Sequence, residues 1–150
     1  MIQITRTDAA NEDFRTMVAA LDLDLAIRDG DEHAFFAQYN KSDHIKHVVV
    51  AYAGNEPVGC GAIKEYTAGT MEIKRMYVPP ERRGQGIASL VLAELELWAR
   101  EMNTMACILE TGVKQPEAIR LYQKNQYTVI PNYGQYAGVE SSVCFEKVLG

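Results

Sequence analysis

Residues 71–102 read MEIKRMYVPPERRGQGIASLVLAELELWAREM. The first part, Met71–Val78, is rich in β-branched and aromatic residues and predicts a strand, which Pro79-Pro80 ends because proline supplies no ladder donor. From Ile87 onward the apolar residues recur at the spacing of one helical face that packs on a sheet. They are Leu90, Val91, Leu95, Trp98 and Met102. The stretch therefore predicts a strand, a glycine-containing turn and an amphipathic helix in direct succession.

The turn, Arg82–Gly86, leads into the N-terminus of the helix. A helix N-terminus carries about half a positive charge and several free N–H groups. Gly84 and Gly86 leave those amides uncovered, and Arg82 and Arg83 add positive charge beside them. This combination is suited to an oligophosphate anion.

Three phosphate-binding motifs can be compared with this turn. A Walker A loop requires Lys-Ser or Lys-Thr after its glycines, and neither pair follows here. A dinucleotide fingerprint needs a third glycine where Ser89 stands, but Glu110 lies near the place of its acidic residue, so this motif stays as an alternative. The pattern Arg/Gln-x-x-Gly-x-Gly/Ala is met in full by residues 83–88, RGQGIA.

Through this third pattern, residues 83–88 strongly resemble the acetyl-CoA pyrophosphate loop of the GNAT superfamily of N-acetyltransferases. A second block, Gln115–Lys124, resembles the Asn-x-x-Ala-x-x-Leu-Tyr-x-Lys helix of the same family. Gln115 replaces the usual asparagine, which can shift the contact of that residue with the cofactor. Gln126-Tyr127 replaces the usual Gly-Phe, which alters a turn more than a mechanism.

The rest of the chain supplies the other elements of an α/β fold. Alternation and turn signals predict strands near residues 2–5, 48–53, 58–66, 70–78, 104–111, 127–130 and 143–148. Helices are expected after the N-cap residue Asn11, at His33–Tyr39, from Ile87 and from Pro116. The order βααβββαβαββ describes a single domain, residues 1–150, with about four helices and a mixed, mostly antiparallel seven-stranded sheet. It is also the GNAT order, so the resemblance covers nearly the whole chain.

The resemblance implies a cofactor site around the turn. The backbone of the fourth strand would pair with the pantetheine arm where the fourth and fifth strands part, and the turn would hold the pyrophosphate. The residues expected to bind the cofactor are Met76, Tyr77, Val78, Arg83, Gly84, Gln85, Gly86, Ile87, Ala88 and Gln115. The cofactor would be acetyl-CoA, with CoA as the product.

Acyl transfer from a thioester needs an acid for the leaving thiolate and an amine that has lost its proton. Tyr122 matches the family's usual general acid, and Glu72 matches a glutamate that draws off the amine proton in some members. Glu110, at the end of the fifth strand, is the second candidate for base or substrate anchor. Structural alternatives stay open: Tyr122 as a core residue, and Glu72 as a cross-strand partner of Lys64 or Lys74.

The acceptor side of the site carries no motif that identifies the amine. Tyr39, Tyr133 and Tyr136 can wall an amine pocket, and residues 23–46 and 131–138 should set specificity because they are loop-rich. A small polyamine, an amino acid, an antibiotic and a protein N-terminus all stay open as the amine substrate.

The composition limits which kinds of partner and which cell compartment we expect for the protein. Apolar content of 47% and charged content of 23% are ordinary for a globular protein, and a net charge of −5 argues against a nucleic-acid-coating protein. The longest apolar run, Val48–Ala53, is far too short for a membrane span, and Met1–Arg6 does not resemble a signal peptide. We therefore expect a cytoplasmic protein. Its three cysteines lack metal-ligand spacing, so we expect buried, reduced thiols and no metal site.

Three functions from different classes follow. The first, which we prefer, is an enzyme that moves an acetyl group from acetyl-CoA to a primary amine directly in a ternary complex. The second is a non-catalytic CoA or acyl-CoA sensor, against which the retention of Tyr122 and Glu72 counts. The third is a dinucleotide-binding protein, which the missing third glycine weakens. A homodimer is one assembly that the chain can form.

Overall fold

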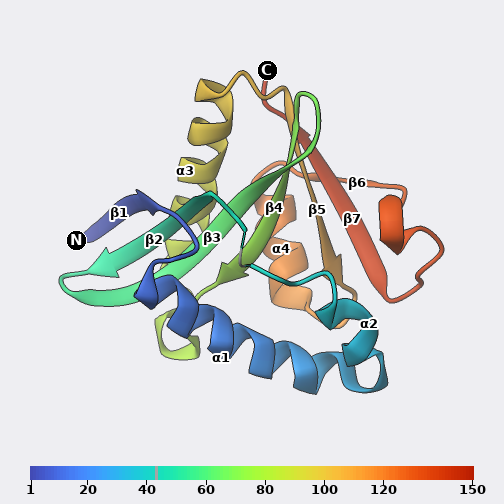
Figure 1. Ribbon diagram of the computed structural model, residues 1–150, viewed down its shortest axis with the longest axis horizontal. Helices are drawn as coiled ribbons and strands as arrows, with labels where there is room; N and C mark the ends of the chain where they lie inside the picture. The colour runs from blue at the N-terminus through green and yellow to red at the C-terminus, as the bar shows by residue number, and fades with distance from the viewer. Residues whose placement is uncertain (43) are drawn as a thin grey trace.

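The computed structural model describes residues 1–42 and 44–150 and joins the strands into one sheet with the order β1-β2-β3-β4-β5-β7-β6 (Figure 1). The strands are β1 (Ile2–Thr7), β2 (His47–Ala53), β3 (Glu56–Thr67), β4 (Thr70–Tyr77), β5 (Ala106–Gly112), β6 (Thr128–Ile130) and β7 (Ser142–Val148). The helices are α1 (Glu12–Asp29), α2 (His33–Ala37), α3 (Ile87–Glu101) and α4 (Pro116–Lys124). Neighbouring strands are antiparallel except β4 and β5, which α3 joins as a parallel pair. The expected α/β class and element order are confirmed.

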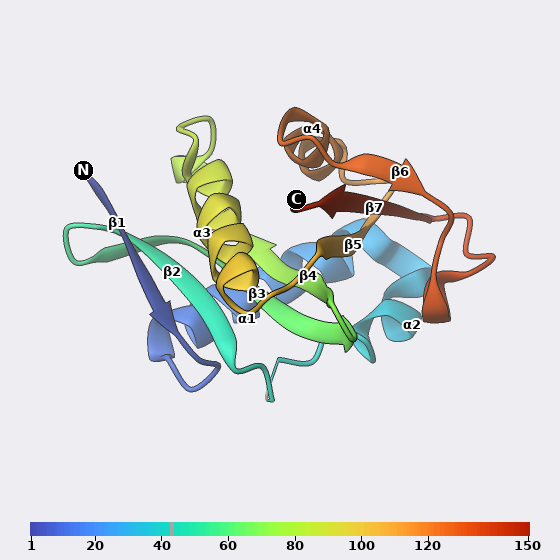
Figure 2. The same cartoon turned by 90° about the horizontal axis from the view of Figure 1, so that it is seen from above.

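Helices cover both faces of the sheet because its central strands are apolar on both sides. Val49 and Ala51 of β2 pack in the cluster that contains the buried face of α3. Val48 and Val50 point to the other face and pack with Phe14 of α1. Figure 2 shows α3 and α4 on one side of the sheet and α1 and α2 on the other.

Local signals fix both ends of α1. The side chain of Asn11 accepts a hydrogen bond of 2.9 Å from the Phe14 amide, so the expected N-cap is confirmed. Gly30, with φ of 55°, ends the helix because glycine enters that region at little cost. Asp29 is consequently the last residue of α1.

One expectation for α3 is wrong. Leu90 is 45% exposed, although the sequence pattern assigned it to the face on the sheet. The buried residues are Ile87, Val91, Leu92, Leu95, Glu96 and Ala99. The contact with the sheet is centred on the Ile87–Val91–Leu95 row, which turns Leu90 away from it.

The split between β4 and β5 is the feature that positions the site. The two strands pair only from Thr70 opposite Ala106 to Glu72 opposite Ile108. Figure 1 shows them separating towards the end where α1 and α4 lie. A bulge in β4 accompanies the split, since Arg75 has φ of 58° and β4 has one extra residue opposite β3.

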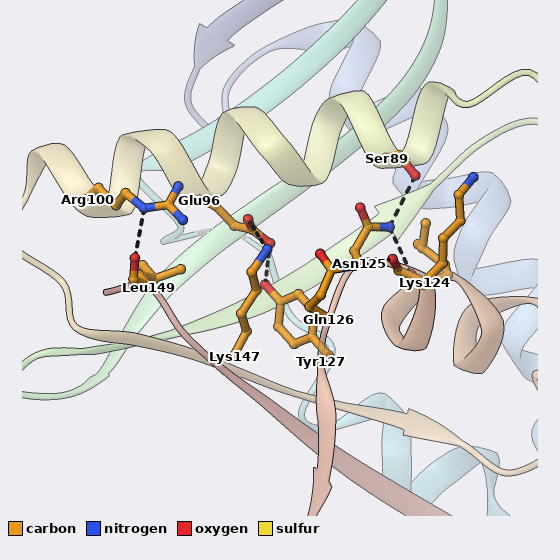
Figure 3. Close-up of polar contacts among 10 residues, drawn as sticks. Ser89, Glu96, Arg100, Lys124, Asn125, Gln126, Tyr127, Lys147 and Leu149 are labelled. Carbon is orange, nitrogen blue, oxygen red and sulfur yellow. Dashed lines mark hydrogen bonds and ion pairs between the residues drawn. The ribbon is translucent and has the colours of Figure 1, made fainter.

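Polar contacts connect α3 with the C-terminal part of the sheet on the far side of the split (Figure 3). The buried Glu96 carboxylate accepts 2.9 Å and 2.8 Å hydrogen bonds from the Tyr127 hydroxyl and the Lys147 ammonium. At the two ends of α3, the Asn125 side chain donates to Ser89 and the Arg100 side chain donates to the carbonyl of Leu149. These contacts hold the start of α3 in a fixed relation to α4.

Candidate active site

The turn before α3 has the backbone of an anion-binding loop. Gly84 and Gly86 have φ of 81° and 78°, a conformation that residues with a Cβ rarely adopt. A Cβ built at either position would meet nothing within 4 Å, so the space beside this backbone is open. Gly86 is the N-cap of α3, and no side chain caps that end. Free amides, open space and the helix dipole together fit the diphosphate of a CoA molecule.

The two arginines of the loop have different partners. Arg82 forms an ion pair of 2.7 Å with Glu56. The Nε of Arg83 donates a 2.8 Å hydrogen bond to the Val78 carbonyl, and its guanidinium lies 5.8 Å from the centre of the Tyr77 ring. Among the described residues no carboxylate pairs with Arg83, so it is the more available cation for a phosphate.

A cavity of about 520 Å³ runs from this loop into the split between β4 and β5. It is lined by parts of α1, α2, β4, the glycine loop, the end of β5, α4 and Tyr136. Every residue that the sequence assigned to the cofactor lines this cavity except Gln85. Gln115 does so as the N-cap residue of α4, although its side chain makes no capping hydrogen bond. The backbone of β4 beyond Glu72 has no β5 partner and can accommodate an extended ligand there.

Tyr122 is both a core residue and a cavity residue. It is 6% exposed, and its ring centre lies 5.7 Å from that of Tyr127 and 6.0 Å from that of Phe145. In the described part of the chain its hydroxyl has no hydrogen-bond partner, and the residue lines the cavity. Burial, and then the charge of Glu110, raise the pKa of Tyr122. The hydroxyl therefore keeps its proton at neutral pH, as an acid must.

Glu110 lies in the same cavity at the end of β5. Its carboxylate accepts a 2.7 Å hydrogen bond from the Ser142 hydroxyl. Burial raises the pKa of Glu110 to about 7, although the Ser142 hydrogen bond acts in the opposite direction. A carboxylate that titrates near neutral pH can take a proton from an ammonium group and release it again.

Glu72 is buried and engaged at both carboxylate oxygens. The Tyr133 hydroxyl donates a 2.6 Å hydrogen bond to Oε2, and the Lys74 ammonium lies 3.6 Å from Oε1. Lys74 also donates to the Tyr39 carbonyl at 3.0 Å. Glu72 thus pairs with Lys74, one of the two lysines named for it in its structural role, and it also lines the cavity.

The three candidate tyrosines of the acceptor side lie in two layers. Tyr136 lines the cavity, whereas Tyr39 and Tyr133 are not part of its lining. The ring centres of Tyr39 and Tyr133 each lie 5.9 Å from that of Tyr136, in edge-to-face contacts. Tyr39 and Tyr133 therefore support the wall from behind, and their role in substrate binding stays a prediction.

Sequence reasoning missed two charged groups that line this cavity and one ion pair beside it. Asp29 is 9% exposed and lines the cavity. Arg75 is 6% exposed, lines it too and is paired with Asp22 of α1. Arg28 of α1 forms an ion pair with Glu117 of α4 across the split. No single-sequence signal separates such buried charges from an ordinary exposed helix face.

Residues 9–127 match the sequence profile described as Acetyltransferase (GNAT) family. The chain belongs to the GNAT acetyltransferase family. This GNAT chain is 39% identical to IAA acetyltransferase of Azospirillum brasilense over 102 residues, 67% of each protein. It is 28% identical to Acetyltransferase Atu2258 of Agrobacterium fabrum over 130 residues, 87% of this chain and 93% of that protein.

Solved structures have the same fold as this GNAT chain. A protein from Klebsiella pneumoniae, described as an acyl-CoA N-acyltransferase, superposes with a TM-score of 0.83 at 32% identity, over 100% of this chain and 99% of that one. The PaiA N-acetyltransferase of Thermoplasma acidophilum, solved in complex with coenzyme A, gives a TM-score of 0.72 at 18% identity over 99% of both chains. The second likeness concerns the fold alone.

The GNAT fold also bears on the alternatives. A dinucleotide fingerprint requires a parallel sheet, and the mostly antiparallel sheet here does not fit it.

Among residues 1–42 and 44–150 no three His, Cys, Asp or Glu side chains gather as a metal site. In the same residues, no helix has the length and apolar character that a membrane crossing requires. Cys60, Cys107 and Cys144 are buried free thiols, as expected.

Proposed function

We propose that this GNAT protein transfers the acetyl group of acetyl-CoA to a primary amine, directly within a ternary complex. The observation that carries the proposal is one cavity that begins at the free amides of the Gly84–Ala88 loop and contains both Tyr122 and Glu110. The coenzyme A bound to the Thermoplasma acidophilum relative supports the choice of cofactor. Cytoplasmic location and homodimer formation stay expectations of the sequence, to be tested by fractionation and sedimentation.

Different residues along the cavity would bind the cofactor and transfer protons. Bound acetyl-CoA supplies the acetyl thioester. The loop amides and Arg83 neutralise the diphosphate, and the open edge of β4 holds the extended arm. The Tyr122 hydroxyl would give its proton to the departing thiolate, Glu110 would receive one proton of the incoming ammonium, and the second proton lost from the nitrogen would restore the Tyr122 hydroxyl. Much of the rate would come from holding the amine against the thioester carbonyl.

Glu72, which the sequence analysis named first as the base, is here the second candidate. Its carboxylate already accepts from Tyr133 and lies beside Lys74, whereas Glu110 accepts from Ser142 alone among the described side chains. This difference favours Glu110 as the group that exchanges protons with the amine. Glu72 would then hold Lys74 and the Tyr133 loop in place.

The proposal is tested by titrating the protein with acetyl-CoA, CoA and NAD, and then measuring thiol release with a panel of primary amines and matched alcohols. We expect binding of acetyl-CoA and CoA but not NAD, and thiol release with amines. Binding of acetyl-CoA without thiol release from any acceptor would favour the sensor function. Release with alcohols alone would overturn transfer to nitrogen.

A further inference from the structure

At the end of the cavity away from the glycine loop, two carboxylates have no cation partner among the described residues. Each cation there already has a carboxylate partner: Lys74 pairs with Glu72, Arg75 with Asp22, and Arg28 with Asp24 and Glu117. Two carboxylates of the cavity lining, Asp29 and Glu110, are in no ion pair among the described residues. Glu110 has the Ser142 hydroxyl as a partner, but Asp29 has no hydrogen bond from any described group.

Asp29 is placed where folding alone would not favour a negative charge. It is 9% exposed and is the last residue of α1, at the negative end of the helix dipole. His33 and Lys114 lower the pKa of Asp29 through space, but burial outweighs them and raises it. A carboxylate that is largely removed from water and has no partner costs stability. A cation supplied by a ligand would remove this cost, and Asp29 lines the cavity where such a ligand would lie.

The wall of this end suits an aliphatic chain between two charges. Leu21 and Leu25 of α1, Phe36 of α2 and Tyr136 line the cavity together with Asp29 and Glu110. Methylene groups are stabilised when they leave water for such a surface. Aromatic rings in addition attract ammonium groups.

Resting on the proposed function, we propose that the acceptor is a terminal aliphatic diamine, with one amine at Glu110 and Tyr122 and the distal ammonium on Asp29. The nitrogen near Tyr122 forms the bond to the acetyl carbon as the carbon–sulfur bond breaks. Glu110 takes one proton of the reacting ammonium before attack, Tyr122 supplies the proton of the released thiol, and the second proton that the nitrogen loses restores the Tyr122 hydroxyl. The distal ammonium stays charged throughout and serves only to bind.

The test compares the terminal diamines of butane, pentane and hexane with the monoamines of the same chain lengths. At its best chain length the wild-type protein should show a kcat/KM for the diamine at least about tenfold above that for the matched monoamine, the effect of one hydrogen-bonded charge. Asp29→Asn should raise KM for the diamine by about tenfold or more and leave kcat nearly unchanged. The monoamine should be unaffected by this substitution.

Asp31→Asn is the matched control, because Asp31 is exposed, lies two residues from Asp29 and is outside the cavity lining. It should leave the diamine preference intact. Acetylation of monoamines and diamines with equal efficiency, or an equal loss for both in Asp29→Asn, would overturn the diamine proposal while leaving the acetyltransferase proposal standing. If no amine is turned over, calorimetry decides: diamine binding that Asp29→Asn abolishes supports the ligand class, and unchanged or absent binding rejects it.

Discussion

The Tyr133 hydroxyl donates a 2.6 Å hydrogen bond to the Glu72 carboxylate. Tyr133 lies in the loop between β6 and β7, and Glu72 lies in β4. Because β5 stands between β4 and β7 in the sheet, this hydrogen bond joins segments on the two sides of β5. The Lys74 ammonium occupies the other oxygen of Glu72 at 3.6 Å. Of the two carboxylates that the sequence singled out, Glu72 is therefore the more committed to the fold and Glu110 the more available to a substrate.

The pH dependence of turnover should consequently follow Glu110. Its pKa of about 7 predicts that kcat/KM rises with pH through neutrality, because only the deprotonated carboxylate accepts the amine proton. Glu110→Gln should lower kcat/KM by about a hundredfold at neutral pH. At alkaline pH kcat/KM should recover, because the ammonium group of the substrate then loses its proton to solvent. A full pH–rate profile for each variant provides the measurement.

Two further variants make the assignment sharper. Ser142→Ala removes a hydrogen bond that favours the charged form of Glu110. The acidic limb of the pH–rate profile should therefore move to higher pH. Glu72→Gln should keep the limb in place. If instead Glu72→Gln abolished the limb and Glu110→Gln preserved it, the sequence-based assignment of the base to Glu72 would be restored.

Tyr122→Phe should separate chemistry from packing. The substitution keeps a ring that is 6% exposed and removes only a hydroxyl without a hydrogen-bond partner in the described residues, so stability and acetyl-CoA affinity should change little. Turnover should fall by about a hundredfold, the lower range for a positioned acid. Single-turnover measurements at saturating substrates test this directly. An unchanged chemical step would remove Tyr122 from the mechanism.

Gly86→Asp should weaken CoA binding by at least about tenfold, or about 1.4 kcal/mol, because it places bulk and negative charge beside the loop amides. Gly138→Asp is the control: Gly138 has the same φ of 78°, is equally open around its Cβ position and lies outside the cavity. Both variants place a side chain at the same positive φ. Calorimetric titration with CoA should therefore distinguish them, and equal affinities would contradict the assignment of the loop.

The Tyr127–Glu96 contact should contribute more to stability than a similar contact near the surface. Both residues are buried, at 3% and 5% exposed, so Tyr127→Phe should lower the free energy of unfolding by about 1.5–3 kcal/mol. Tyr52→Phe removes a 2.7 Å hydrogen bond to the half-buried Asp13 and should cost less than about 1 kcal/mol. Urea unfolding measures both. In a Glu96→Gln background, the effect of Tyr127→Phe should shrink, and an undiminished effect would place its cause elsewhere.

The sequence allowed the element order, the Asn11 cap and the glycine loop to be predicted because each depends on signals within a few residues. The exposure of Leu90 and the bulge at Arg75 depend on long-range packing instead. A Cβ at Gly61 of β3 would meet the Met76 side chain of β4 and lie 3.0 Å from the Val91 and Leu95 side chains of α3, so β3, β4 and α3 pack at close range in a way that no local pattern contains. The partners of Glu72 and the isolation of Asp29 are long-range in the same sense.

The short pairing of β4 with β5 has a consequence for how backbone protons exchange with solvent. Only Thr70–Glu72 of β4 is bonded to β5, so amides further along β4 that face the split have no strand partner on that side. Such amides should exchange deuterium quickly in the free protein and slowly once an extended ligand lies along the edge. The strand would then report occupancy of the cavity residue by residue, without any measurement of turnover.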